Sequence, residues 1–346
     1  MEKIDIKSLT LEELTQHIVG LGEPKFRAKQ IYEWLHQKHA FSFSEMTNIS
    51  AKFQQRLESV FYIDSLKMIK KLVSQIDNTV KYLYELRDGE FVECVLMEYR
   101  HGTSICISSQ VGCKMGCTFC ASTIAGFVRN LTPSEMLDQI YCSALDSGRK
   151  ISSVVMMGIG EPLDNYDNVL RFLELVSDEN GMNLSLRHLS LSTCGLVERI
   201  CDLAEKRLGL TLSVSLHAPN DTVRSKTMPV SRRYSMNELL KACRFYAEET
   251  HRRISFEYAL IRGVNDSKRD AEELASRLRG MLCHVNLIPV NPVEEAGYQA
   301  AAREDVFRFQ NLLLSMGINT TVRRTLGADI HAACGQLRRN SQNVKR

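Results

Sequence analysis

The sequence predicts an α/β protein whose main part is an incomplete (βα)6 barrel, for two reasons. After residue 101 a pattern of strand, loop and helix recurs six times, and such a repeat is typical of parallel strands joined by helices. A complete eight-unit barrel typically needs about 250 residues, more than the chain has after Ser104. The preceding residues have other periods, so a small helical module and a short antiparallel β extension are expected before the barrel.

Residues 1–62 are predicted to form the helical module. Thr10-x-x-Glu13 is a capping box that begins a first helix, Pro24 begins a second, and a third is expected from about Ser50. The polar side of the second helix is basic, at Lys25, Arg27, Lys29 and Lys38.

Residues 63–100 show a period of two, which is typical of strands, and Asp88-Gly89 predicts a hairpin turn between two such runs. In the second run, Glu93 alternates onto the apolar face of the strand. This position is unusual for a carboxylate. Glu93 is therefore interpreted either as an edge-strand charge at a solvated rim or as a functional acid.

Residues 101–325 are predicted to hold the barrel, and residues 326–346 a C-terminal segment. Two barrel helices begin at capping boxes, Thr132-Pro133-x-Glu135 and Ser235-x-x-Glu238. In parallel barrels the loops at the carboxyl ends of the strands build the active site, so residues that follow the strands should converge. The predicted strands lie near 104–108, 151–157, 187–192, 211–216, 253–260 and 285–290.

The loop after the first barrel strand carries Cys113, Cys117 and Cys120 in C-x-x-x-C-x-x-C spacing. Thiolates hold iron-sulfur clusters and zinc alike, and structural sites of either kind usually take four protein ligands. A 4Fe-4S cluster held by three thiolates leaves one iron open to a bound molecule. The loop therefore predicts a reactive cluster, with structural zinc or buried free cysteines as the alternative. Its spacing resembles that of the radical S-adenosylmethionine (SAM) superfamily.

The second barrel strand is followed by Gly158-Ile159-Gly160-Glu161. Two glycines without the rest of a dinucleotide fingerprint are weak evidence by themselves. Beside a cluster loop, Gly160 is expected to let the backbone approach a ligand closely, and Glu161 to accept a hydrogen bond from an ammonium group. Both residues therefore suit the methionine end of SAM.

Polar residues also follow later strands. Ser192, Ser215 and Asn291 offer hydroxyl and amide groups for the carboxylate and ribose of SAM. Leu216 and His217 follow the fourth strand and are expected to line the same pocket. A lone histidine at a strand end is more often structural than catalytic, so no catalytic role is assigned to His217.

Eleven irregularly spaced cysteines do not suggest a secreted disulfide framework. No apolar run approaches the roughly 20 residues of a membrane helix, and the N-terminus has no signal-peptide form. A cytoplasmic protein with reduced thiols and no membrane association is expected. The formal net charge of +3 neither requires nor excludes nucleic acid. Cys106 and Cys334 stand apart from the triplet, and by default each is a small packed hydrophobe.

Taken together, the chain resembles the radical SAM RNA adenine methyltransferases, and among them the group that methylates carbon 2 of an adenosine in 23S ribosomal RNA and, in some bacteria, in transfer RNA. The resemblance covers nearly the whole chain. It rests on motifs in order at residues 22–31, 108–113, 158–162, 215–220, 284–291 and 332–337.

The resemblance implies a 4Fe-4S cluster, two SAM molecules per turnover, and three catalytic residues. Cys334 would take a methyl group from one SAM, and a 5′-deoxyadenosyl radical made from the other would remove hydrogen from that S-methyl group. The methylene radical would add to adenine. Glu93 would then remove the ring proton, and Cys106 would attack the sulfur of Cys334, which leaves a transient disulfide. This chemistry suits carbon 2, which is too electron-poor for ordinary methyl transfer.

The resemblance also implies a reductant such as flavodoxin or ferredoxin, RNA binding by the N-terminal helices and the basic tail, and a monomer. Two alternatives stay open. One is the related enzyme that methylates adenine carbon 8 and confers antibiotic resistance. Cys194 departs from the small hydroxyl or apolar residue expected in the carbon 2 group. The other is a non-catalytic RNA-binding protein with a structural metal.

Overall fold

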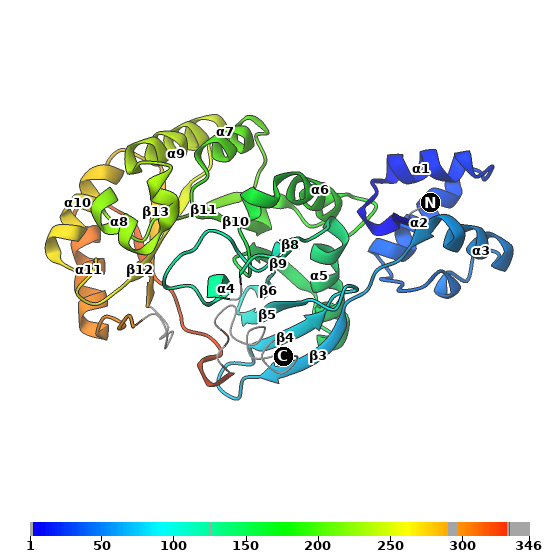
Figure 1. Cartoon of the computed structure of the whole chain (residues 1–346), viewed down its shortest axis with the longest axis horizontal. Helices are drawn as coiled ribbons and strands as arrows, with labels where there is room; N and C mark the ends of the chain where they lie inside the picture. Colours follow the sequence, from blue (N-terminus) through cyan, green and yellow to red (C-terminus); the bar gives the residue numbers. More distant parts are fainter. Residues whose placement is uncertain (1–2, 125, 290–296, 331, 333–346) are drawn as a thin grey trace.

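The computed structural model describes residues 3–124, 126–289, 297–330 and 332, and its architecture confirms the predicted α/β class (Figure 1). One sheet of ten strands forms the centre, in the order β14-β13-β12-β11-β10-β9-β6-β5-β4-β3. The strands of this sheet are β3 (Lys67–Val73), β4 (Val80–Glu85), β5 (Phe91–Tyr99), β6 (Gly102–Cys106), β9 (Ile151–Met156), β10 (Leu189–Thr193), β11 (Thr211–Ser215), β12 (Ile254–Leu260), β13 (Cys283–Pro289) and β14 (Thr320–Val322).

The barrel is open because of how its first strand is paired. From β6 to β14 each strand pairs in parallel with the next. On its other edge β6 pairs with β5 in the antiparallel sense, where a closed barrel would place a further parallel strand. All six predicted barrel strands are present, and β14 adds a short seventh at the far edge.

The helices between the parallel strands cover the outer face of the sheet (Figure 1). Their apolar sides join the strands in one continuous core. The predicted capping boxes are confirmed at Thr132 and Ser235. The helices of this part are α4 (Ala121–Ile124), α5 (Pro133–Ser147), α6 (Tyr166–Ser177), α7 (Val197–Glu205), α8 (Asp221–Thr227), α9 (Met236–Thr250), α10 (Lys268–Leu278) and α11 (Arg303–Ser315).

The N-terminal helices α1 (Leu11–Gly20), α2 (Phe26–His36) and α3 (Ala51–Val60) form a separate cluster beside the barrel, as predicted (Figure 1). The capping box at Thr10 is present. A buried ion pair between Lys7 and Asp138 of α5, 2.5 Å apart, ties this cluster to the barrel.

The predicted antiparallel strands of residues 63–100 are present, and the hairpin between β4 and β5 turns at Asp88-Gly89. They do not form a sheet of their own, since β5 pairs directly with β6 and continues the barrel sheet. Two short pairs, β1 (Ile4–Asp5) with β2 (Phe61–Tyr62) and β7 (Gln110–Val111) with β8 (Arg129–Asn130), complete the strands. No helix within the described ranges is long and apolar enough to cross a membrane.

Candidate active site

Two adjoining cavities lie at the carboxyl end of the parallel strands. The first has a volume of about 300 Å³ and lies between the cysteine loop and the ends of β9 to β13. The second, about 200 Å³, lies over β5 and β6. They share a wall formed by Met157, Gly158, Ile288, Pro289 and Arg323. A molecule bound in the first cavity can therefore meet a group that enters the second.

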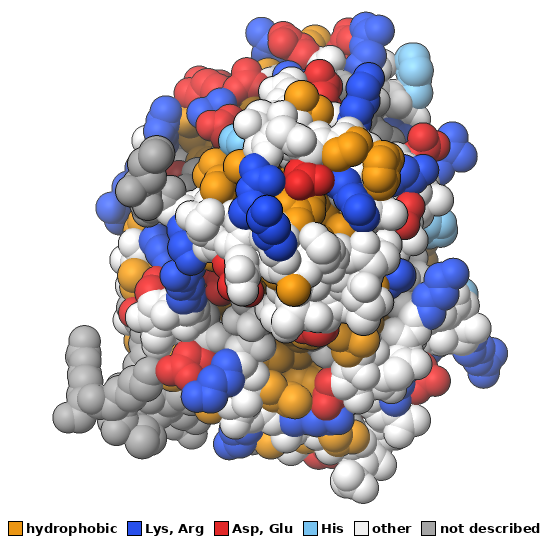
Figure 2. Space-filling model, turned by 90° about the vertical axis from the view of Figure 1, so that its right-hand side faces the viewer, with side chains coloured by type: hydrophobic (Ala, Val, Ile, Leu, Met, Phe, Trp, Pro, Cys, Tyr) orange, Lys and Arg blue, Asp and Glu red, His pale blue; other side chains and the backbone are white. Residues whose placement is uncertain are grey.

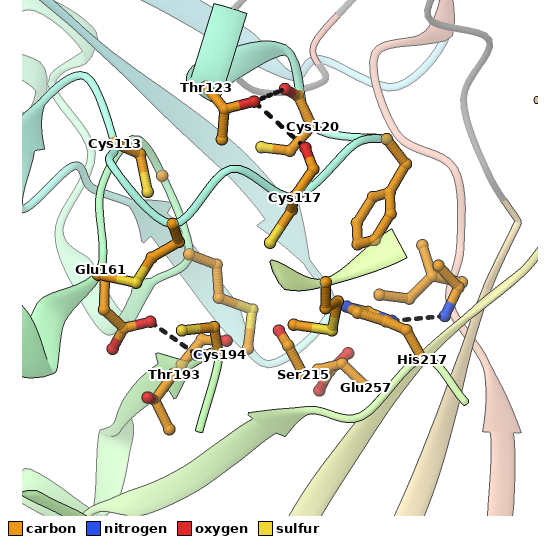
Figure 3. A pocket seen from close by; sticks show the side chains of 18 of the residues that line it. Cys113, Cys117, Cys120, Thr123, Glu161, Thr193, Cys194, Ser215, His217 and Glu257 are labelled. Carbon is orange, nitrogen blue, oxygen red and sulfur yellow. Dashed lines mark hydrogen bonds between the residues drawn. The ribbon is translucent and has the colours of Figure 1, made fainter. Parts of the chain in front are cut away.

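The cysteine loop closes the first cavity from above, and Figure 3 shows the thiols of Cys113, Cys117 and Cys120 pointing into the space beneath it. Its tight path needs Gly112, which has a φ of +79° and where an added Cβ would stand 1.7 Å from the carbonyl oxygen of Gly126. Thr123 Oγ1 donates to the carbonyls of Cys117 (3.2 Å) and Cys120 (2.9 Å). The three thiols are thus held on one loop.

The donor set fits a 4Fe-4S cluster better than a zinc ion. Burial raises the pKa of the Cys113 thiol to about 12, and it also raises the pKa of Cys117. A strong cationic centre is needed to hold such thiols as thiolates. Among residues that the structure describes, no three His, Cys, Asp or Glu side chains are placed to hold one metal ion. In a 4Fe-4S cluster each thiolate binds a different iron, so the three sulfur atoms are expected to lie farther apart than the ligands of a single metal ion.

The two glycines after β9 let their segment pack closely against the chain that follows β6. A Cβ at Gly158 would stand 2.6 Å from the carbonyl oxygen of Ile107, and one at Gly160, where φ is +108°, would stand 2.6 Å from the Cβ of Gln110. Both glycines also line the first cavity. Close approach of the Gly160 backbone to a ligand stays a prediction.

Gly158→Ala is expected to destabilise the protein by about 1–3 kcal/mol, because the new methyl group would collide with backbone atoms that cannot move aside. Thermal unfolding measures this effect. Gly20→Ala is the matched control, because a Cβ there meets nothing within 4 Å and the variant should unfold near the wild-type temperature. Equal unfolding temperatures for Gly158→Ala and wild type would contradict the packing argument.

Glu161 is buried at the edge of the first cavity, where it holds two backbone groups (Figure 3). One carboxylate oxygen accepts from the amide of Leu163 (3.1 Å) and the other from the amide of Cys194 (2.6 Å). Burial raises the pKa of the carboxyl, and these hydrogen bonds act in the opposite direction. Each oxygen keeps acceptor capacity toward the cavity.

The structure brings most of the other predicted SAM-binding residues together. Ser192, Ser215 and His217 line the first cavity. The side chain of Leu216 packs in the core and does not line this cavity, so this residue can meet a ligand only through its backbone. Asn291 lies outside the described residues.

His217 has a fixed orientation and protonation state. Its Nδ1 accepts from the amide of Ala259 (2.8 Å), which leaves the proton on Nε2. Burial, with the nearby charge of Arg224, lowers the pKa of the ring to about 3. The backbone is left-handed at φ +53°, a strained conformation that Asn265 supports by donating to the His217 carbonyl (2.8 Å). A neutral donor therefore faces the cavity.

Two charged residues of the cavity were not predicted. Glu257, in the middle of β12, is buried and accepts from Asn286 Nδ2 (2.8 Å) and Ser255 Oγ (3.0 Å). The sequence feature that could have indicated this residue is that Glu257 is the single charged residue in the run ISFEYAL. Arg323 lies on the wall shared by both cavities. In the sequence it forms a basic pair with Arg324, and such pairs usually lie on a solvated surface.

Glu93 and Cys106 line the second cavity together. The carboxylate of Glu93 is only 2% exposed, so the interpretation as a charge at a solvated rim was wrong. It forms an ion pair with the fully buried Lys81 of β4 at 2.9 Å. Burial raises the pKa of the Cys106 thiol, and the charges of Arg323 and Lys81 oppose that rise.

Cys334 lies outside the described residues, but Ala332 lies on the wall of the second cavity. Two aspartates anchor the segment that leads there to the turn between β3 and β4. Asp329 accepts from Ser74 Oγ (2.7 Å) and the Gln75 amide (2.8 Å), and Asp77 accepts from the Gly327 amide (2.8 Å).

Comparisons with known proteins agree with this geometry. Residues 4–63 match the model of the ribosomal RNA large subunit methyltransferase N-terminal domain, and residues 107–275 match that of the radical SAM superfamily. The chain is 55% identical over 339 residues to a probable dual-specificity RNA methyltransferase RlmN of Alkaliphilus oremlandii, covering 98% of both proteins. It is 50% identical over 336 residues to the protein of the same name in Clostridium novyi, covering 97% of this chain and 98% of that protein.

A solved structure is also similar. The crystal structure of a radical SAM methyltransferase from Sphaerobacter thermophilus superposes with a TM-score of 0.92 at 43% identity, covering 96% of this chain and 98% of that one.

Proposed function

Because this chain belongs to the RlmN family of dual-specificity RNA methyltransferases, we propose that its two cavities divide the reaction, one holding SAM at a 4Fe-4S cluster and the other holding the target adenosine. The enzyme is a radical SAM methyltransferase that methylates carbon 2 of an adenosine in 23S ribosomal RNA. The observation that supports this division of the reaction is that the two cavities share a wall.

In the first cavity, Cys113, Cys117 and Cys120 hold the cluster, which when bound supplies the electron that cleaves SAM to methionine and a 5′-deoxyadenosyl radical. The carboxylate of Glu161 accepts from the SAM ammonium with its remaining lone pairs. Nε2–H of His217 donates to an acceptor of the same molecule. The other contacts come from residues at the strand ends, namely Gly160, Ser192, Ser215, Leu216 through its backbone, and Asn291.

In the second cavity, Glu93 accepts the proton that leaves carbon 2, and Cys106 resolves the intermediate. Cys334 carries the transferred carbon. The Cys106 thiolate attacks the sulfur of Cys334, and the S–C bond breaks with its electron pair going to the transferred carbon. That carbon takes up a proton to become the methyl group on adenine, and the two cysteines end as a disulfide. Support comes from the shared cavity of Glu93 and Cys106, and from the anchoring by Asp77 and Asp329 of the segment that leads to Cys334.

RNA reaches the second cavity as an unstacked base. The N-terminal helices offer cations paired with aromatic rings: the guanidinium of Arg27 lies 5.0 Å from the ring of Phe26, which is 56% exposed, and Lys38 lies 3.9 Å from the ring of Trp34. Figure 2, which faces these helices, shows Lys and Arg side chains interspersed with acidic ones. The module and the basic tail therefore bind RNA at several points.

The remaining parts of the proposal concern the cellular setting. A flavodoxin or ferredoxin reduces the cluster, the enzyme works as a monomer in the cytoplasm, and transfer RNA is a second substrate. The proposed domains comprise residues 1–62, 63–100, 101–325 and 326–346.

Parallel methylation of 23S ribosomal RNA and transfer RNA transcripts tests the function, after anaerobic reconstitution with iron and sulfide. Mass spectrometry of the nucleosides should show 2-methyladenosine in both. Only 8-methyladenosine would contradict the carbon 2 assignment, and unmodified transfer RNA would remove the second substrate. A reconstituted protein that does not cleave SAM would contradict the enzymatic proposal.

Lys81→Met is expected to destabilise the protein by about 3–5 kcal/mol, because it removes the buried ammonium that pairs with the carboxylate of Glu93. Glu93→Gln should be destabilising for the same reason, applied to the buried ammonium of Lys81. The double variant Lys81→Met/Glu93→Gln should lose less stability than the sum of the two single variants. Urea unfolding measures all three, and strictly additive losses would contradict a direct pairing.

A further inference from the structure

Arg224 of α8 is fully buried behind residues that line the first cavity, yet it forms no ion pair with a carboxylate in the parts of the chain that the structure describes. Its exposed fraction is 0%. Within residues 3–124, 126–289, 297–330 and 332, no carboxylate lies within the 4 Å of an ion pair with this guanidinium. A buried charge that is left uncompensated typically costs several kcal/mol.

The guanidinium is held by three backbone carbonyls at the ends of two strands. Nη2 donates to Cys194 (2.6 Å) and to Ser215 (3.2 Å), and Nε donates to Leu216 (3.2 Å). These neutral acceptors satisfy hydrogen bonds but do not neutralise the charge. Nη1 is buried without a hydrogen-bond partner among the described residues, so one donor of the guanidinium, like its charge, is left unsatisfied.

The groups around Arg224 indicate where that anion belongs. Cys194 and Ser215, whose carbonyls hold the guanidinium, line the same cavity as the thiols of Cys113, Cys117 and Cys120. Asp221 is also near, but its carboxylate lies beyond ion-pair distance of the guanidinium and accepts from the amide of Met236 (2.7 Å). A 4Fe-4S core held by three thiolates carries net negative charge, and reduction adds one more electron.

We propose that Arg224 is the buried counter-charge of the cluster, and that it makes the cluster easier to reduce. The proposal rests on ligation of the cluster by Cys113, Cys117 and Cys120. Because a nearby cation stabilises the reduced cluster more than the oxidised one, Arg224 raises the reduction potential. It also holds the ends of β10 and β11, where Cys194 and Ser215 line the first cavity. Arg224 is therefore a positioning residue rather than a catalytic one.

The test is a redox titration of the reconstituted full-length protein, followed by electron paramagnetic resonance in the absence of SAM, so that the SAM carboxylate cannot contribute. In Arg224→Gln, which removes the charge but keeps amide donors, the equilibrium constant for reduction should fall about tenfold, equivalent to about 59 mV for one electron. Arg224→Lys should stay within about threefold of wild type. Arg199→Gln, at an exposed ion pair with Asp202 on α7, should not change it.

Iron content, and thermal unfolding with and without the cluster, show whether each variant still binds the cluster. Retention of iron by Arg224→Lys but not by Arg224→Gln would support the role of the charge. Reconstitution should also raise the unfolding temperature of wild type more than that of Arg224→Gln. An unchanged potential in Arg224→Gln, equal shifts in both variants, or loss of iron from both would overturn the proposal. If wild type itself assembled no cluster, the proposed function would fail instead.

Discussion

Cys106→Ala is expected to leave RNA covalently attached to the enzyme and to lower the yield of methylated RNA by more than about 1,000-fold, the scale seen when a covalent catalyst is removed. In the proposed mechanism, the carbon added to adenine is still bonded to the sulfur of Cys334. Attack by Cys106 is the step that breaks this bond. Without that thiol the adduct has no route to product.

Denaturing electrophoresis with radiolabelled RNA measures the adduct as a band of reduced mobility that nuclease treatment removes. Cys201→Ala is the matched control, because Cys201 lies on α7, which contributes no side chain to the cavity of Cys106. The control should release product normally. Release of methylated RNA by Cys106→Ala at the wild-type rate would contradict the resolving role.

Cys117→Ala is expected to abolish assembly of a functional 4Fe-4S cluster and, with it, reductive cleavage of SAM. The two remaining thiols would leave two irons of the cluster without protein ligands, and burial disfavours ionisation of the Cys113 thiol without a bound metal. Iron and sulfide content after reconstitution, the brown absorbance of the protein, and 5′-deoxyadenosine production measure the effect.

Cys194→Ala is the control for that experiment, because Cys194 lines the same cavity. It also tests whether the cluster has a fourth ligand. The backbone amide that Glu161 holds is unchanged in this variant, so the protein should keep its iron. Loss of iron from Cys194→Ala, or retention of a full cluster by Cys117→Ala, would show that the ligand set is assigned wrongly.

Predictions from the sequence were most accurate where the signal was local. Capping boxes at Thr10, Thr132 and Ser235 placed helix starts correctly, because each box is a set of contacts within four residues. The pattern of strands and helices predicted an open barrel, although the continuity of β5 with β6 appears only in the sheet pairing. Pairing between distant strands depends on the packing of the whole sheet.

Predictions failed where a residue's neighbour is far away in the chain. The close packing of Gly160 on Gln110, which also requires a glycine there, was not predicted. The burial of Glu93 depends on Lys81 from another strand, which strand alternation cannot reveal. Arg224 gave no signal in the sequence, because a helical arginine is normally solvated.

The cysteine triplet shows what the sequence alone can predict and what depends on the tertiary structure. By itself the sequence predicted the three ligands of the cluster and determined the type of chemistry, because their spacing within one loop already brings the thiols together. Only the tertiary structure decided that the cavity of Glu93 and Cys106 shares a wall with the cavity of the three thiols, and that a buried cation lies behind that cavity. These juxtapositions depend on the packing of strands and helices that lie far apart in the chain, and no local spacing encodes them.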